Sequence, residues 1–145
     1  WKRPVWGGRF ISVALALSWL WVAIAFLYLR FYLIHVVANW YALGFIAEAL
    51  LIGWFGIIKN CFSHQVNYRL QRIAGLALLL FSFFLYPLIT LLSGRSFMQL
   101  EMFALTPDPT ALATLAVLLL HRAPAVLFVI PIAWGLISVS TLSVI

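Results

Sequence analysis

Long apolar runs without charge constrain the fold of this chain more than any other feature. Residues 10–29 form a run of 20 residues that contains no Asp, Glu, Lys or Arg. A helix rises about 1.5 Å per residue, so this run covers roughly 30 Å, the thickness of a bilayer's hydrocarbon core. Similar runs occupy 36–58, 73–93 and 124–145, and a shorter one occupies 109–121. The pattern predicts an all-α fold, a single polytopic bundle of about five transmembrane helices.

Two further segments need separate treatment. The span at 109–121 is too short to cross a bilayer alone, so we expect it to begin beneath the outer surface or to cross where the bilayer is locally thin. In the mixed segment 96–104, Phe97, Leu100 and Phe103 recur at helical spacing. This spacing predicts a short helix that lies in the membrane interface.

The composition supports a lipid environment. Charged residues make up 8% of the 145 residues, against about 25% in soluble domains. The net charge of +6 comes from Lys and Arg that are scattered between apolar runs, so no nucleic-acid-binding face is predicted. The lipid bilayer is the expected partner. The single cysteine, Cys61, excludes an internal disulfide, and Trp1 in place of an initiating Met indicates a fragment or a processed form.

The distribution of basic residues predicts an orientation. If all five segments span, seven Lys and Arg fall on one side and two on the other. Lys and Arg are enriched on the cytoplasmic side, so we expect a multi-pass protein of a cell inner (plasma) membrane with Trp1 cytoplasmic and Ile145 outside. The count also favours 109–121 as a true crossing, because only then does Arg122 join the basic side. The seven are Lys2, Arg3, Arg9, Lys59, Arg69, Arg72 and Arg122, and the two are Arg30 and Arg95.

Ordered local signals precede the fourth apolar run. Asp108 has the side chain of a good helix N-cap, because its carboxylate can accept bonds from free N–H groups. Pro109 suits the next position, where no N–H is needed, and Thr106 is kept extended by Pro107. The sequence therefore predicts an N-cap at Asp108 and a helix that begins at Pro109.

Several apolar stretches carry a resemblance to a known family. They are residues 103–120, 85–88 and 129–134, with looser similarity at 19–21 and 39–45. Together they resemble a family of bacterial integral membrane proteins known as domain of unknown function 6064. The family pattern often has a Cys between the two prolines where this chain has Asp108, so no role of that thiol is carried over. The resemblance implies a bacterial inner membrane and offers no activity.

Glu48 is the most informative single residue, because it lies near the middle of the second run. A lone acid at that depth costs a few kcal/mol. Measured along each span, Ser18, Ser82 and Trp134 lie at similar depth and can offer it hydroxyl and indole partners, whereas no Lys or Arg does. Two interpretations stay open: a proton or cation site formed with these residues, or a neutral, hydrogen-bonded acid that joins helices.

Other polar or helix-breaking residues give weaker signals. Pro87 and Pro131 lie inside predicted spans and remove backbone donors, so we expect helix kinks there, or carbonyls freed for an ion site. His64 and His121 fall on the same side and could meet over a metal or haem. No ligand pair at helical spacing supports this alternative, so no cofactor and no metal site is predicted.

The sequence contains no motif that predicts an enzyme. No nucleophile–base–acid set, phosphate-binding glycine loop or His/Glu metal motif can be assembled from it. The pairs Ala49/Gly53 and Thr110/Thr114 are typical of close helix contacts. We therefore expect a non-enzymatic membrane protein, an accessory or structural subunit that associates with other membrane proteins or with itself. The alternative is a small transporter or channel with Glu48 as its mid-membrane site.

Overall fold

The computed structural model describes residues 5–25, 38–94 and 106–143, and in these ranges the chain is all-helical, as predicted. Within them the β contact is one isolated bridge between Gln65 and His121. The α-helices are α1 (Val5–Trp21), α2 (Ala38–Gly53), α3 (Arg69–Leu80), α4 (Tyr86–Leu92), α5 (Pro107–Leu120) and α6 (Val126–Ser143). Two π-helical segments, η2 (Trp54–Ile58) and η4 (Phe81–Leu85), continue α2 and join α3 to α4, and η3 (Cys61–Ser63) is a 3₁₀ turn.

Three helical stretches are long and apolar enough to cross a membrane: Trp6–Ala25, Asn39–Ile58 and Arg69–Ile89. The helices α5 and α6 are apolar but shorter in the described residues. The helix of the third stretch begins at Arg69, four residues before the apolar run that starts at residue 73. The change from polar to apolar residues marks the edge of the apolar surface, whereas the backbone is already helical after the extended Tyr68. The predicted interfacial helix at 96–104 lies outside the described residues.

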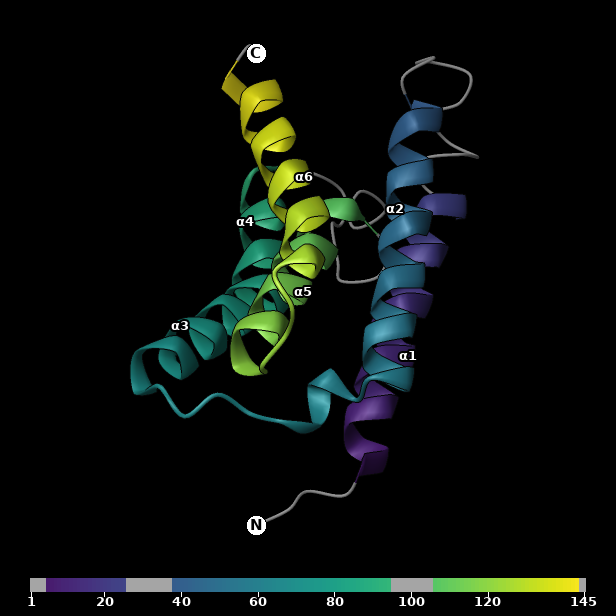
Figure 1. The fold of residues 1–145 in the computed structure, drawn as a ribbon. Helices are drawn as coiled ribbons and strands as arrows, with labels where there is room; N and C mark the ends of the chain where they lie inside the picture. Colours follow the sequence, from purple (N-terminus) through teal and green to yellow (C-terminus); the bar gives the residue numbers. More distant parts are fainter. Residues whose placement is uncertain (1–4, 26–37, 95–105, 144–145) are drawn as a thin grey trace.

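The helices form two groups that meet along α5 and α6. Figure 1 shows α1 beside α2 on one side, and α3, α4, α5 and α6 on the other. Helix α5 packs against α3 and α6 and also contacts α1. In Figure 1 it begins below the upper end of α2. Its start therefore lies among the other helices.

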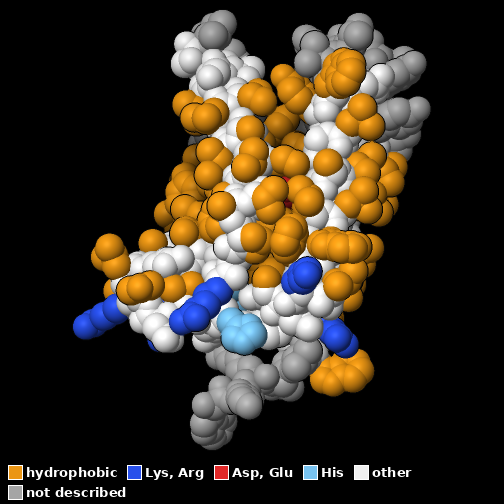
Figure 2. All heavy atoms as spheres, viewed as in Figure 1, with side chains coloured by type: hydrophobic (Ala, Val, Ile, Leu, Met, Phe, Trp, Pro, Cys, Tyr) orange, Lys and Arg blue, Asp and Glu red, His pale blue; other side chains and the backbone are white. Residues whose placement is uncertain are grey.

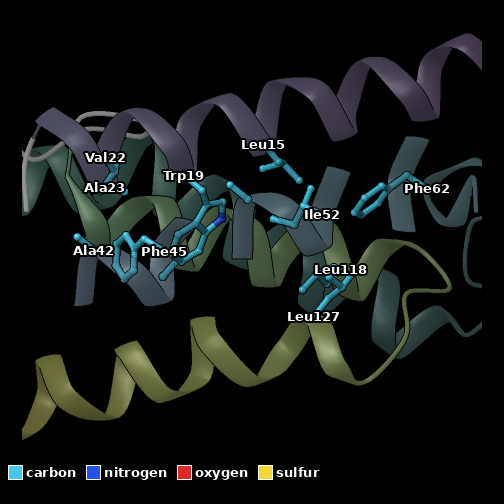
Figure 3. Packing of buried hydrophobic residues seen from close by; sticks show 12 residues of the cluster. Leu15, Trp19, Val22, Ala23, Ala42, Phe45, Ile52, Phe62, Leu118 and Leu127 are labelled. Carbon is cyan, nitrogen blue, oxygen red and sulfur yellow. The ribbon is translucent and has the colours of Figure 1, made fainter. Parts of the chain in front are cut away.

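Apolar side chains from both groups form the core. Trp19 from α1, Phe45 from α2 and Leu118 from α5 belong to one buried cluster, which Figure 3 shows between the helices. Near Phe62, at one end of this cluster, η2 packs closely against α1. A Cβ atom added at Gly56 would overlap the side chain of Ser12, so glycine is required where η2 crosses α1.

Basic side chains gather at one end of the molecule, at the bottom of Figure 2, while the middle of the surface is hydrophobic. At this end the connector between η2 and α3 pairs with the turn between α5 and α6. Val66 N–H donates to Leu120 O at 3.1 Å, and Arg122 N–H donates to His64 O at 2.9 Å. The described Lys and Arg, all exposed, are Arg9, Lys59, Arg69, Arg72 and Arg122.

Candidate functional site

The start of α5 differs from its predicted form. Thr106 has extended backbone angles (φ −129°, ψ 154°) and is the N-cap, Pro107 takes the first helical position, and Asp108 lies in the first turn. The predicted N-cap at Asp108 is therefore wrong. The reason is that a residue before proline is held extended, which is also the conformation of an N-cap, so the first proline already begins the helix.

Asp108 instead accepts hydrogen bonds from three side chains of two other helices. The indole Nε1 of Trp134 donates to Oδ1 at 2.7 Å. The hydroxyl groups of Tyr86 and Ser138 donate to Oδ2 at 2.9 Å and 3.0 Å. A carboxylate is suited to this arrangement because it is an acceptor on both oxygens, and the first turn of a helix favours negative charge. These bonds join the start of α5 to α4 and α6.

Further hydrogen bonds hold α5 at Pro109, Thr110 and Thr114. Ser82 in η4 donates to the carbonyl of Pro109 at 2.6 Å. The indole of Trp19 in α1 donates to Thr114 Oγ1 at 2.8 Å, and Thr114 in turn donates to the carbonyl of Thr110 at 2.7 Å. Both threonines are buried, so the small-residue pair Thr110/Thr114 makes its contacts inside this chain.

Glu48 lies in α2 with 0% of its surface exposed. Neither of its carboxyl oxygens has a hydrogen-bond partner in the described part of the chain. A buried polar group without a partner costs about 1–3 kcal/mol, and more when it is charged. Glu48 is therefore both deeply buried and unsatisfied, a combination that folded proteins rarely keep.

The hydrogen-bond partners predicted for Glu48 bind elsewhere. Ser18 donates to the carbonyl of Ala14 in its own helix at 2.8 Å, Ser82 donates to Pro109 and Trp134 donates to Asp108. Their predicted hydrogen bonding to Glu48 is wrong. Similar depth places side chains at one level but does not fix their rotation about each helix axis, and a helical serine can bond to the carbonyl four residues back.

Aromatic rings from α1, α2 and α6 pack against one another. The ring of Trp134 stands edge-on to Tyr41 and Phe45, with centroids 5.4 Å and 4.9 Å away. Phe45 packs in the same way against Trp19 at 4.6 Å. Phe45 precedes Glu48 by about one helical turn, while the indole N–H of Trp134 binds Asp108. These aromatic rings thus connect the surroundings of one acid to those of the other.

The two prolines at which the sequence predicts kinks, Pro87 and Pro131, lie in different local structure. Pro87 follows the π-helical segment η4, in which the N–H of Tyr86 donates to Phe81 O, five residues back. Figure 1 shows α3 leaning away from the axis of α4 at this point. Pro131, in contrast, lies inside the continuous helix α6. A wider turn of this kind is often found at functional sites, and here it presents Ser82 to α5.

The histidines and the cysteine lie at the basic end. His121 is buried, with Nδ1 2.8 Å from Val117 O and its ring edge-on to Phe62. His64 is exposed. Among the residues that the structure describes, no group of three or more His, Cys, Asp or Glu could hold a metal ion. Burial raises the pKa of the Cys61 thiol, against a smaller lowering by backbone hydrogen bonds.

The sequence did not predict that Tyr86 and Ser138 bind Asp108. One signal was available: Trp134 and Ser138 are four residues apart, so both project from one face of α6. Tyr86 carries no comparable signal. Its contact with Asp108 depends on how α4 packs against the start of α5, which the sequence pattern does not specify.

Comparison with known proteins places the chain in a family. Residues 1–145 match the model of a family of unknown function, DUF6064. The match covers the whole sequence and confirms the resemblance, so the chain belongs to this family. Neither the curated proteins nor the solved structures contain a match.

Proposed function

We propose that this protein is a small membrane transporter or channel for protons or small cations, with Glu48 as its central site. It spans a bacterial inner membrane through all five helical segments. The basic end faces the cytoplasm. The sequence favoured an accessory subunit over a transporter. We now favour the transporter, because Glu48 lacks the bonds that a purely helix-joining acid would make.

The observation that carries the proposal is the state of Glu48. It lies in the candidate span Asn39–Ile58, it is fully buried, and its carboxyl oxygens are unpaired in the described structure. An ionisable residue inside a membrane span is a functional-site candidate by default, since its insertion costs a few kcal/mol. A second subunit could not satisfy Glu48 without rearrangement, because its own chain already covers it.

The membrane topology is supported by the direction of the helices. Helices α1, α3 and α6 begin at the basic end, and η2 and α5 end there (Figure 1). All the described Lys and Arg lie at this end, which is the arrangement of cytoplasmic loops. A start of α5 at depth is compatible with lipid surroundings, because irregular backbone is tolerated where protein buries it.

The test is ion flux in proteoliposomes. The wild-type chain should dissipate an imposed proton or cation gradient, and Glu48→Gln should abolish this flux while the variant stays folded. Ser140→Ala is the matched control, since Ser140 is exposed and its hydroxyl binds its own helix at Leu136 O. Equal flux from Glu48→Gln and wild-type protein would refute the proposal.

A second candidate is the accessory or structural subunit. Exposed residues of α2 and η2 favour it: Trp40 and Leu50 of α2 and Trp54 of η2 are exposed, and an added Cβ at Gly53 would meet nothing within 4 Å. A neighbouring transmembrane helix could approach closely at such a site. Purification in mild detergent tests this function. A stoichiometric membrane partner that Gly53→Leu releases would support it, and an unaccompanied monomer would exclude it.

A further inference from the structure

The chemistry around Glu48 restricts which ion it can take. Hard metal cations need several oxygen ligands, about six for magnesium and six to eight for calcium. A proton needs a single acceptor. The number of oxygen atoms that reach the Glu48 carboxyl therefore discriminates between a proton site and a metal-cation site. This question rests on the proposed function and names its substrate.

No hydrogen-bonding group reaches Glu48 in the described structure. Its two carboxyl oxygens are buried and have no hydrogen-bond partner there. The buried hydroxyls of the helices that enclose α2 point to their own backbones: Ser12 donates to Gly8 O at 2.8 Å and Ser18 to Ala14 O at 2.8 Å. On α2 itself, Phe45 and Ile52 lie one turn away on either side, and both belong to the apolar core.

Asp108 provides a contrast within the same chain. Its carboxyl group is half-buried and has two hydroxyl oxygens and an indole nitrogen within 3.0 Å. Two hydroxyl groups, from Tyr86 and Ser138, reach the carboxyl group of Asp108, whereas no hydrogen-bonding hydroxyl group reaches that of Glu48 in the described structure. The two acids therefore differ in the number of hydroxyl groups that reach them as well as in burial.

None of the described Lys and Arg side chains pairs with the Glu48 carboxyl group. The helices packed against α2 are α1 and α6, together with its own continuation η2. Arg9 is the titratable group of the described α1; it is exposed at the basic end and donates to Asn60 Oδ1 at 3.2 Å. The described residues of α6 and η2 contain no titratable group, α2 contributes Tyr41, and α5 contributes Asp108. A neutral carboxyl group is consistent with these surroundings.

We infer that Glu48 is a proton-binding site and that the ion handled by this protein is the proton, not a metal cation. The step is a reversible proton transfer between the Glu48 carboxylate and water. One O–H bond forms as another breaks, and no electron is transferred. Phe45 and Ile52, which lie one turn from Glu48 on either side of it in α2, are apolar and supply none of the ligands that a dehydrated metal cation would need.

Infrared difference spectroscopy of the full chain in lipid tests this inference. The spectrum of Glu48→Gln is subtracted from that of the wild type across a series of pH values, in choline, sodium, potassium or magnesium chloride. We expect the C=O stretch of one protonated carboxyl group, which disappears as pH rises and does not change when a metal cation replaces choline. If Glu48→Gln does not fold, Glu48→Met takes its place in the subtraction.

Three results would overturn the inference. A band that sodium, potassium or magnesium removes at a pH where choline leaves it would show a metal site. A band absent at every pH, or present at every pH, would show that Glu48 does not exchange a proton. These results are independent of flux. If the wild-type chain shows an intact Glu48 titration but no ion flux, the transport function alone is refuted. Glu48-dependent metal-ion flux without that titration would refute only the proton assignment.

Discussion

Replacing Asp108 tests the hydrogen bonds that hold the start of α5. Asparagine keeps one acceptor oxygen and replaces the other by an NH₂ group. The oxygen should turn toward Trp134, whose indole nitrogen is a donor and cannot accept. The NH₂ group then faces Tyr86 and Ser138, whose hydroxyl groups can rotate and accept. Asp108→Asn should therefore keep most of the contacts, whereas Asp108→Ala removes all three.

The expected magnitudes follow from the number of bonds. Each hydrogen bond contributes about 0.5–1.5 kcal/mol net, so the loss of three in Asp108→Ala should cost about 3 kcal/mol. Asp108→Asn should cost about 1 kcal/mol, because neutral bonds replace bonds to a charged acceptor. A helix cap at this position would give a different result, about 1 kcal/mol for alanine and close to zero for asparagine.

Reversible unfolding in mixed detergent micelles measures both variants. Trp134→Phe provides the control, because it removes one donor and leaves Asp108 in place. In the Trp134→Phe background, Asp108→Ala should cost about 1 kcal/mol less than in the wild type, since bonded groups do not act additively. An alanine cost near 1 kcal/mol that is additive with Trp134→Phe would refute the hydrogen-bond assignment.

Two further predictions concern packing and topology. Gly56→Ala should destabilise the protein by about 1–3 kcal/mol through overpacking where η2 crosses α1. Gly53→Ala should not, because nothing lies within 4 Å of the new methyl group. Equal stability of the two variants would contradict the close approach of η2 to α1. In a Cys61→Ser background, a membrane-impermeant maleimide should label Ser93→Cys on intact cells and Asn67→Cys only after the membrane is opened, and the reverse pattern would invert the orientation.

The fold was predictable from sequence to the extent that long apolar runs determine it. Such a run favours a helix because an apolar environment cannot satisfy backbone polar groups, so the all-helical fold and the three long apolar helices near 10–29, 36–58 and 73–93 follow from hydropathy. Helix ends do not follow in the same way. Arg69 is already helical and Thr106 is the cap, because backbone angles decide where a helix starts and charge decides only where an apolar surface starts.

The positions of the candidate-site residues along their helices were predictable, but their side-chain contacts were not. Glu48 is buried, as its place in the run indicated, yet Ser18, Ser82 and Trp134 donate to other acceptors. The sequence gives the height of each side chain along its helix. Which helix faces which, and at what rotation, comes from tertiary packing. For the same reason the role of Asp108 could not be predicted, because it depends on how α4 and α6, which carry its donors, pack against the start of α5.

Glu48 and Asp108 show why an acid in an apolar helix should be judged by its stability effect. Asp108 stabilises the fold through three bonds, whereas Glu48 makes none in the described structure. Methionine has a similar length and no unsatisfied oxygen, so Glu48→Met should raise the free energy of unfolding by about 1–3 kcal/mol. Loss of flux with this gain would fit a site kept for function at the expense of stability. If Glu48→Met instead unfolds more easily, the carboxyl group has structural partners and its assignment as a functional site is wrong.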